Sequence, residues 1–211
     1  MKITSTNIAK PTIIEYNGKK TTTGIYKMPT NQPIYLGKEL VKDDEVSDRK
    51  YHGGTFKACY LFSENEYSFW KNLYPDLNWD WGMFGENITV NGLDETKLQI
   101  GDIYKMGSAL VQITQPREPC YKLGVKFGNQ QVIKQFMAHG RPGTYVRILE
   151  EGFVKNNDTL TLVEPAKNSI STTDFYSLLF AKEKNHEHIK RILNNDSLPL
   201  KKREGLKKYL K

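Results

Sequence analysis

The sequence has little of what usually assigns a protein to a functional class. It contains only two cysteines, Cys59 and Cys120, and neither belongs to a Cys-x-x-Cys pair or a Cys/His cluster, so no structural zinc site is expected. No run of about 18 apolar residues is present, and the first residues lack the apolar segment of a secretory signal. Nucleotide-phosphate loops and serine-hydrolase elbows are absent as well. These absences predict a cytoplasmic protein with no membrane partner.

An excess of one charge is also missing from most of the chain. Residues 167–211 carry eleven Lys and Arg against five Asp and Glu, a net charge of +6. Residues 1–166 carry 20 against 19, a net charge of +1, without the basic stripe that nucleic-acid recognition requires. No nucleic acid is therefore expected as a partner. The basic tail is interpreted as solvated helix faces, with contact to an acidic partner as the alternative.

What the first 166 residues do have is a series of short strands separated by turns. Asn17-Gly18 lies between two such segments, and both residues tolerate positive φ, which predicts a β-hairpin. Gly107-Ser108 separates residues 98–106 from 109–114 in the same way. Further strands are expected at Cys59 and over residues 145–149 and 159–163. With 38% hydrophobic residues, the chain can bury a hydrophobic core. The pattern predicts a mainly β fold with some α, in which the strands form a curled or barrel-like domain over residues 1–166.

Helices are predicted around this domain and after it. Ser63-Glu64-Asn65-Glu66 has the form of a capping box, and apolar residues follow it at helical spacing. A second peripheral helix is expected over residues 130–139. Residues 167–211 combine leucine and isoleucine at helical spacing with breaks at residues 194–196 and at Pro199. They predict a small C-terminal unit of three helices starting near Thr172, Asn185 and Pro199.

Cys120 is the first candidate for chemistry. It lies in the run Gln115-Pro116-Arg117-Glu118-Pro119-Cys120-Tyr121-Lys122, where two prolines restrict the backbone and two cations flank the thiol. Nearby cations favour the charged form of a thiol, whose ordinary pKa is about 8.5, and only the thiolate is a good nucleophile or metal ligand. The alternative is an inert cysteine in a turn, because free cysteine is usually a buried small hydrophobe.

Two further polar clusters accompany the thiol. In the first, His52 precedes Gly53-Gly54, whose amides can approach an anion closely, and Lys57 adds a charge. In the second, Glu86 and Asn87 follow Phe84-Gly85 before a strand. Arg141 supplements the set. A plain turn at the glycines, a histidine satisfied by its loop and a glutamate paired with a lysine are the alternatives.

In this order and spacing, the motifs resemble the signature of the MOSC domain, the family named for the C-terminal domain of molybdenum cofactor sulfurase. They are His52-Gly53-Gly54 with Lys57, Phe84-Gly85-Glu86-Asn87, Ile100-Gly101-Asp102, and Gln115-Pro116-Arg117 with Pro119-Cys120-Tyr121-Lys122. The similarity is greatest to the bacterial YiiM-like branch, in which three helices follow the barrel. It implies a MOSC-type β-barrel with peripheral helices over residues 1–166 and a small three-helix domain over residues 167–211.

The resemblance also implies an activity. Relatives bind molybdenum cofactor (Mo-molybdopterin) and reduce N-hydroxylated compounds, including hydroxylaminopurine base analogues, with electrons from a separate reductase. The molybdenum ligand falls on Cys120, a soft thiolate that suits this metal. Arg117, Lys122, Lys57 and Arg141, with the amides of Gly53 and Gly54, are expected to bind the phosphate and pterin. Asn87 is expected at the pterin edge, and Glu86 or His52 in proton transfer. Pyridoxal phosphate is not expected.

Other functions stay open at this point. The same activated Cys120 would serve a carrier that holds a persulfide and passes sulfur to a cofactor or an enzyme. A binding protein, with the tail as a nucleic-acid or partner-docking module and the barrel as its scaffold, is a third hypothesis. A homodimer through the barrel or the tail is compatible with each of them.

Overall fold

The structure is a computed structural model, which describes residues 1–47 and 52–210. In this part of the chain the strands are β1 (Lys2–Ile8), β2 (Thr12–Tyr16), β3 (Lys19–Thr23), β4 (Met28–Thr30), β5 (Ile34–Leu36), β6 (Cys59–Ser63), β7 (Ile88–Asn91), β8 (Ile103–Met106), β9 (Ala109–Pro116), β10 (Thr144–Glu150), β11 (Gly152–Val154) and β12 (Leu160–Glu164). The α-helices are α2 (Tyr67–Leu73), α3 (Tyr121–Lys126), α4 (Gln131–His139), α5 (Thr172–Phe180), α6 (His186–Leu193) and α7 (Leu200–Lys207). Short 3-10 turns are η1 (Thr55–Lys57), η2 (Glu64–Glu66) and η3 (Lys208–Leu210).

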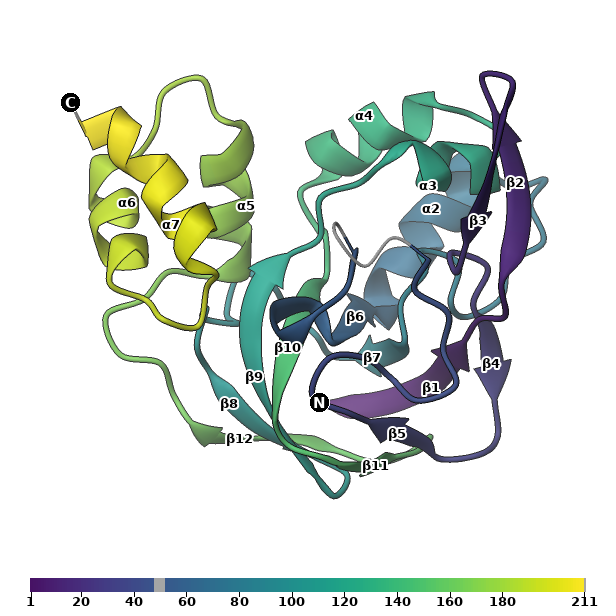
Figure 1. The fold of residues 1–211 in the computed structure, drawn as a ribbon, viewed down its shortest axis with the longest axis horizontal. Helices are drawn as coiled ribbons and strands as arrows, with labels where there is room; N and C mark the ends of the chain where they lie inside the picture. Colours follow the sequence, from purple (N-terminus) through teal and green to yellow (C-terminus); the bar gives the residue numbers. More distant parts are fainter. Residues whose placement is uncertain (48–51, 211) are drawn as a thin grey trace.

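Eight strands form one curled sheet in the order β12-β8-β9-β10-β6-β7-β1-β4 (Figure 1). Neighbours pair antiparallel, apart from β6 and β7, which run parallel. The ladder is open, but Lys2 of β1 forms an isolated bridge with Thr159, and the amide of Leu160 donates to the carbonyl of Met1 at 3.0 Å. The sheet thus curls until β1, the first strand in the sequence, meets the start of β12, the last. The predicted class, mainly β with peripheral helices, is confirmed, although the strand ladder itself does not close into a barrel.

The predicted hairpins are present. Asn17 and Gly18 have φ values of 52° and 71° and join β2 to β3, as expected for residues that tolerate positive φ. Gly107, with φ of 55°, joins β8 to β9. The second hairpin is shorter than predicted, because β8 starts only at Ile103 and Gly101 has a φ of 103°.

The predicted capping box at Ser63 is wrong in its geometry, although a helix follows. The Ser63 hydroxyl donates to the carbonyl of Leu93 at 3.0 Å and makes no bond to the helix. The segment enters α2 through the 3-10 turn η2 instead. A distant carbonyl competes successfully for the hydroxyl, because Ser63 is fully buried and its oxygen needs a partner there.

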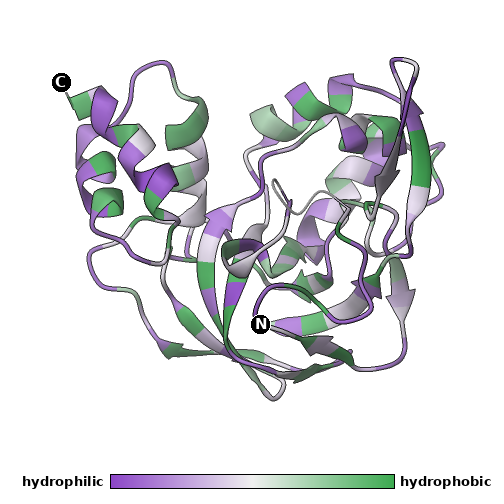
Figure 2. Cartoon of the chain, in the orientation of Figure 1, coloured by the Kyte–Doolittle hydropathy of each residue, from purple (hydrophilic) through white to green (hydrophobic). Residues whose placement is uncertain are grey.

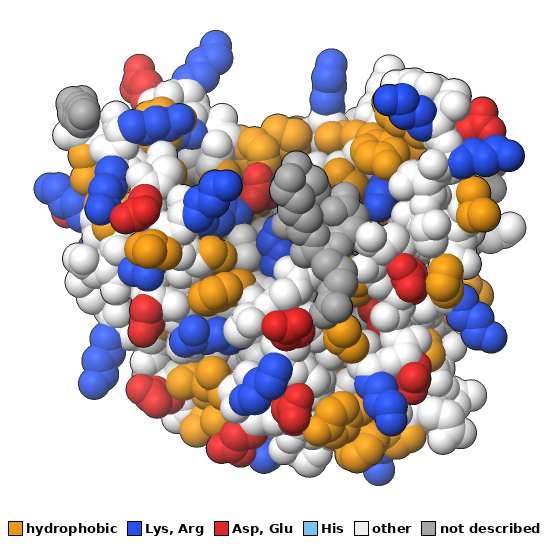
Figure 3. All heavy atoms as spheres, viewed as in Figure 1, with side chains coloured by type: hydrophobic (Ala, Val, Ile, Leu, Met, Phe, Trp, Pro, Cys, Tyr) orange, Lys and Arg blue, Asp and Glu red, His pale blue; other side chains and the backbone are white. Residues whose placement is uncertain are grey.

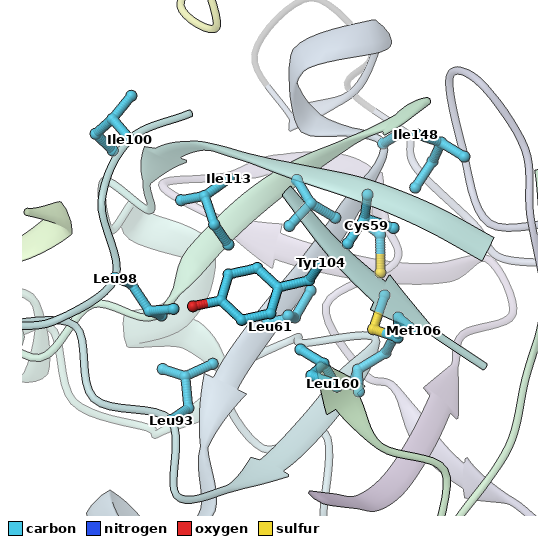
Figure 4. Close-up of a cluster of buried hydrophobic side chains, with 14 of the residues drawn as sticks. Cys59, Leu61, Leu93, Leu98, Ile100, Tyr104, Met106, Ile113, Ile148 and Leu160 are labelled. Atoms are coloured by element: carbon cyan, nitrogen blue, oxygen red, sulfur yellow. The ribbon is translucent and has the colours of Figure 1, made fainter. Parts of the chain in front are cut away.

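Two groups of buried side chains stabilise the fold. The larger lies inside the curled sheet and includes Cys59, Tyr104 and Met106 (Figure 4). The smaller is aromatic and lies between the sheet and helices α2 to α4, with Phe62, Phe84 and Trp70 at its centre. Cys59 is 1% exposed, so its interpretation as a structural strand residue agrees with its surroundings.

The predicted three-helix segment is α5, α6 and α7, and it packs at one side of the sheet (Figure 1). Hydrophobic and hydrophilic residues are interspersed along these helices (Figure 2). Phe175, Ile189 and Leu206 belong to the same core as the sheet strands, so the helices are fastened to the sheet by shared burial. The side chains of Ser171 and Asn185 cap α5 and α6 by accepting from the amides of Asp174 and His188, respectively, and both residue types favour such caps. No helix in the described residues is long and apolar enough to cross a membrane.

Candidate functional site

Cys120 lies where a strand ends and a short helix begins. β9 runs to Pro116, which pairs with Thr144 of β10, and the chain then leaves the sheet for four residues before α3. Cys120 is the residue before α3, and its carbonyl accepts from the amide of Leu123 at 2.9 Å. The thiol is partly exposed, whereas the other thiol, Cys59, is enclosed in the core. Burial also raises the pKa of Cys59, so of the two cysteines only Cys120 is accessible from the pocket.

A pocket opens beside Cys120 and gathers residues from five parts of the chain. The walls combine the β3–β4 connection, residues 44–47, the segment around η1 with the start of β6, the residues before β7, and the Cys120 loop with β10. The lining residues are Thr23, Gly24, Ile25, Lys27, Asp44, Glu45, Val46, Ser47, His52, Lys57, Ala58, Tyr60, Gly85, Asn87, Arg117, Cys120, Lys122 and Tyr145.

Most of the site residues expected from the sequence meet at this pocket. His52, Lys57, Asn87, Arg117, Cys120 and Lys122 all line it. Gly53 and Gly54 lie in the turn between two lining residues, and Gly54 has a φ of 86°, which favours glycine. Side chains separated by up to 70 residues in sequence thus share one cavity.

Arg117 is the most unusual of these residues. It is 5% exposed, its Nε atom is buried without a hydrogen-bond partner, and it forms no ion pair within the described residues. Burial opposes its charge, but Tyr60, Tyr145 and Cys120 hold the pKa of Arg117 above its ordinary value. A buried guanidinium stays charged and normally has a carboxylate partner, so an unpaired one at a pocket wall points to an anionic ligand.

Aromatic and glycine residues fix the position of that guanidinium. It lies 5.0 Å from the ring centroid of Tyr60, in cation–π contact. Gly85 packs beside it: a Cβ there would make an ordinary contact with Nη1 of Arg117, at 3.5 Å, and a tight one with Cγ1 of Ile25, at 3.1 Å. Gly85 also has a φ of 74°. The backbone conformation therefore favours glycine at the position before Glu86.

Two lysines add positive charge to the pocket. Lys122 is 7% exposed and, in residues 1–47 and 52–210, has neither a hydrogen bond nor an ion pair. Lys57 lies 5.6 Å over the ring of Tyr145, and burial, followed by the charge of Lys202, lowers the pKa of Lys57. Together with Arg117, these side chains make one wall strongly cationic.

The pocket lining also includes a buried polar network, and sequence reasoning missed two of its members, Lys27 and Asp44. Lys27 forms an ion pair with Asp44, and their side chains are 6% and 1% exposed. Asn87 donates from Nδ2 to Asp44 at 2.8 Å and accepts at Oδ1 from the amide of Tyr60 at 3.2 Å. Both ends of the Asn87 amide are thus engaged by protein groups. No local motif marks Lys27 or Asp44, because their partners come from distant segments.

Glu86 is placed differently from its neighbour Asn87. It is fully buried, does not line the pocket and accepts from the amides of Gly82 at 2.9 Å and Phe84 at 3.0 Å. The hydroxyls of Thr89 and Tyr67 also donate to it. Four donors satisfy the carboxylate and hold the loop 82–87 in shape. A part for Glu86 in proton transfer stays a prediction that this placement does not favour.

Arg141 also lies apart from the pocket. Its Nη1 atom is 3.1 Å from Asp94 and 3.8 Å from the buried carboxylate of Glu95. Burial raises the pKa of Glu95 to about 7, and Arg141 acts in the opposite direction. The structure gives Arg141 a local carboxylate partner, so its expected part in cofactor binding is not supported by its position.

The donor set suits an anionic cofactor that carries a soft metal. Among the described residues, Arg117 and Lys122 have no carboxylate that forms an ion pair with them, and Cys120 brings a thiol to the same cavity. Within the part of the chain that the structure describes, no three His, Cys, Asp or Glu side chains are grouped to hold a metal. A metal at Cys120 would therefore take its other ligands from a cofactor rather than from the protein.

The family model of the MOSC domain matches residues 48–161. The uncharacterized protein YflK of Bacillus subtilis is 37% identical over 93% of this chain and 88% of its own length. A protein of Gibberella moniliformis called Reductase is 33% identical over 70% of this chain, but over only 27% of its own length. The crystal structure of YiiM from Geobacillus stearothermophilus is 31% identical and superimposes with a TM-score of 0.81, covering 98% of this chain and 97% of that one.

Proposed function

This chain belongs to the MOSC domain family, and from that premise we propose that it binds molybdenum cofactor beside Cys120 and reduces N-hydroxylated compounds to amines. Hydroxylaminopurine base analogues are the proposed substrates. The reaction R–NH–OH + 2e⁻ + 2H⁺ gives R–NH₂ and water, with the N–O bond broken and the electrons supplied by a separate donor reductase. When bound, the cofactor supplies this two-electron chemistry.

The observation that carries the proposal is the unpaired, buried Arg117 in the same pocket as the partly exposed Cys120. A buried guanidinium without a carboxylate lowers stability unless an anion completes it. A phosphate arm is such an anion and takes bidentate hydrogen bonds from arginine. Cys120, in the same pocket, would then be available as the thiolate ligand of the metal that this cofactor carries.

Each pocket residue has a task in this proposal. Cys120 supplies the thiolate ligand to the metal. Arg117 and Lys122 bind the phosphate, and the amides of Gly53 and Gly54 assist. Lys57, whose pKa is lowered mainly by burial, loses a proton more easily than an ordinary lysine and is suited to donate one to the departing oxygen.

Two further side chains take supporting tasks. His52 lines the pocket and is the second candidate for proton supply, because its ordinary pKa lies near neutrality. Asn87 keeps Asp44 in place at the pocket, and because both ends of its amide are engaged by protein groups, its expected hydrogen bond to the pterin edge is not part of this proposal. Glu86 shapes the loop that carries Asn87.

The relative from Gibberella moniliformis supports the class of reaction. Its printed name is Reductase, and its similarity to this chain extends over 151 residues. Because that stretch is a minor part of the longer protein, the relative supports reduction and indicates nothing about the substrate.

The test compares the wild type, Cys120→Ser and Arg117→Met, all produced in a host that makes the cofactor. Molybdenum and pterin are measured in each purified protein, and turnover of an N-hydroxylated purine is followed with dithionite as the electron source. The wild type is expected to contain stoichiometric metal and pterin and to form the amine. Cys120→Ser should lose activity, and Arg117→Met should lose bound pterin. Full activity of Cys120→Ser would contradict the ligand assignment.

The same experiment decides the second candidate function, a persulfide carrier. The partial exposure of Cys120 among cations favours it as well, because cations stabilise an anionic persulfide and an acceptor thiolate must reach its outer sulfur, whose transfer releases the Cys120 thiolate. Wild-type protein with sulfane sulfur on Cys120, and without metal or pterin, would identify the carrier.

A further inference from the structure

A buried carboxylate outside the pocket is connected to the pocket wall through one peptide group. The amide of Gly143 donates to Oε1 of Glu95 at 3.0 Å. The hydroxyl of Tyr60 donates to the carbonyl of Pro142 at 2.7 Å. That carbonyl and that amide belong to the same planar peptide group, which we call the bridging peptide. Two consecutive hydrogen bonds therefore join Glu95 to the hydroxyl of Tyr60.

The bridging peptide is packed tightly against the strand that carries Tyr60. Gly143 has a φ of 65°, and a Cβ there would lie 2.3 Å from the carbonyl oxygen of Leu61 and 2.9 Å from Cε2 of Tyr60. Backbone conformation and space therefore both require glycine at this position. The peptide lies just before β10, so its place beside β6 is fixed by the pairing of these two strands.

Glu95 has little else to hold its carboxylate. The residue is fully buried, and its second oxygen, Oε2, has no hydrogen-bond partner in the described residues. The Nη1 atom of Arg141 is 3.8 Å from that oxygen and lies closer to Asp94, at 3.1 Å. Burying a carboxylate is costly, whereas an apolar residue here would leave the amide of Gly143 without an acceptor. The bridging peptide is thus the contact that accounts for a carboxylate at this position.

The other end of the connection lies in the pocket. Tyr60 lines it, and the guanidinium of Arg117 lies 5.0 Å over the ring. Lys and Arg side chains are scattered over the outer face of the molecule (Figure 3), whereas Arg117 is buried and its charge is compensated in part by this ring. A displacement of the Tyr60 ring would therefore change the position and the environment of the guanidinium.

We propose that Glu95 is a positioning residue of the pocket: by way of the bridging peptide it holds the hydroxyl of Tyr60, and with it the aromatic face under Arg117. The inference rests on the proposed role of Arg117 in anion binding. It adds to that function a residue that lies outside the pocket and touches neither ligand nor metal.

The hydrogen bonds predict which replacements matter. Each bond polarises the bridging peptide and so strengthens the other. A glutamine at position 95 still offers an oxygen to the amide of Gly143, so the connection is kept without the charge. A leucine breaks it and leaves a buried N–H group unpaired. The two variants are therefore expected to differ at Arg117, although both remove the carboxylate.

The experiment observes the guanidinium directly, by the ¹H–¹⁵N NMR signal of its Nε–Hε group in the full-length chain without cofactor. Loss of the signal in Arg117→Lys assigns it, and the ring current of Tyr60 makes its chemical shift sensitive to their relative position. Glu95→Leu and Tyr60→Phe should each displace the signal. The double variant should displace it no further, because both changes break the same connection. Glu95→Gln should leave the signal near its wild-type position.

Titration with inorganic sulfate, followed on the same signal, measures the consequence for anion binding. Glu95→Leu and Tyr60→Phe are each expected to weaken sulfate binding by about twofold to tenfold, the range that one net hydrogen bond covers. Glu95→Gln should rescue the affinity to within about twofold of wild type. A role of Glu95 in stability alone would lower the melting temperature and leave the affinity of the folded protein unchanged.

The matched control is Asp94→Asn, which alters the adjacent carboxylate, whose hydrogen bonds go to Thr96 and Arg141 instead. It should leave the signal and the affinity unchanged. Thermal unfolding checks the fold of each variant, and should Glu95→Leu not fold, Tyr60→Phe tests the same connection from its other end.

An undisplaced signal in Tyr60→Phe, or displacements that add in the double variant, would overturn the inference. A wild-type chain that binds no sulfate would count against Arg117 as an anion site, while the displacements of the signal would still decide the role of Glu95. Neither measurement needs the cofactor, so the result is independent of whether the chain proves to be a reductase.

Discussion

The guanidinium of Arg117 lies 5.0 Å over the ring of Tyr60, and no carboxylate in the described residues forms an ion pair with it. Tyr60 comes from β6 and Arg117 from the loop after β9, so sheet pairing through β10 brings the two together. An aromatic face compensates only part of the desolvation of a buried cation. The pocket is therefore electrostatically incomplete without an anion, and this has a measurable consequence.

Replacing Arg117 by Met should make the protein without ligand more stable, because an uncompensated buried charge is exchanged for an apolar side chain of similar length. We expect a melting temperature about 2–4 °C above wild type, which corresponds to about 1 kcal/mol in a domain of this size. Differential scanning calorimetry checks this. Arg141→Met, which breaks a pair with Asp94, is the control and should lower the melting temperature slightly. A marked loss of stability in Arg117→Met would show that the guanidinium is a structural group.

The two cysteines should differ in both reactivity and stability. Cys59 is enclosed in the core, so Cys59→Ser places a hydroxyl among hydrocarbon and is expected to cost about 1–3 kcal/mol of unfolding free energy. Cys120→Ser, at a partly exposed position, should change the unfolding free energy by less than about 0.5 kcal/mol. Urea unfolding measures both values. Alkylation of the native protein should modify Cys120 alone, and equal labelling of the two thiols would contradict the assignment.

Glu95 should make stability depend on pH. Its pKa is raised by burial from 4.5 to about 7, so between these values the folded protein holds a proton that the unfolded chain has released. The free energy of unfolding should therefore fall as pH rises through this window. The free energy of unfolding of Glu95→Gln, measured relative to that of the wild type, is expected to increase by about 1–3 kcal/mol between pH 5 and about pH 7.5.

Urea unfolding at a series of pH values measures this difference. Glu183→Gln, at an exposed position near the start of α6, is the control and should follow the wild-type curve. Parallel curves for Glu95→Gln and wild type would contradict the prediction.

The stability of the fold should depend on the buried ion pair between Lys27 and Asp44. Asp44→Asn leaves the ammonium group of Lys27 buried without a counter-charge, and we expect the free energy of unfolding to fall by about 3–5 kcal/mol. The double variant Lys27→Met with Asp44→Asn should recover much of this, because the uncompensated cation is gone. Chemical denaturation of the three proteins tests the coupling. An equal loss in the single and double variants would mean that the pair is not electrostatically coupled.

Local chemistry was enough to predict several elements of the fold. Asn17-Gly18 forms its turn because both residues accept positive φ, whatever surrounds them. The starts of α6 and α7 were also predicted from local chemistry, since Asn185 and Pro199 are residues that favour helix starts. The capping box failed because the bond that Ser63 makes depends on Leu93, a residue 30 positions away. Patterns in sequence predict a structure as long as no distant group competes for the same atoms.

The candidate site divides along the same line. The types and spacing of Cys120, Arg117, Lys122, Lys57 and His52 were sufficient to nominate them, because anion binding and thiolate chemistry require those side chains. Only tertiary structure decided which of the nominated groups face the pocket. In the folded protein, Glu86 is buried and accepts hydrogen bonds from its own loop, and Arg141 pairs with Asp94. Folding also pairs Lys27 with Asp44 beside the pocket and Lys202 with Glu118 in the Cys120 loop.

By itself, the sequence determined which side chains are present and which stand beside each other in the chain: the Cys120 thiol, the cations near it, and the turns that divide strands from helices. These are properties of a residue and its close neighbours. The curl of the sheet and the packing of α7 decided which charges have partners and which wait for a ligand. Desolvation and pairing depend on side chains that meet only when distant segments fold together, so no local pattern contains that information.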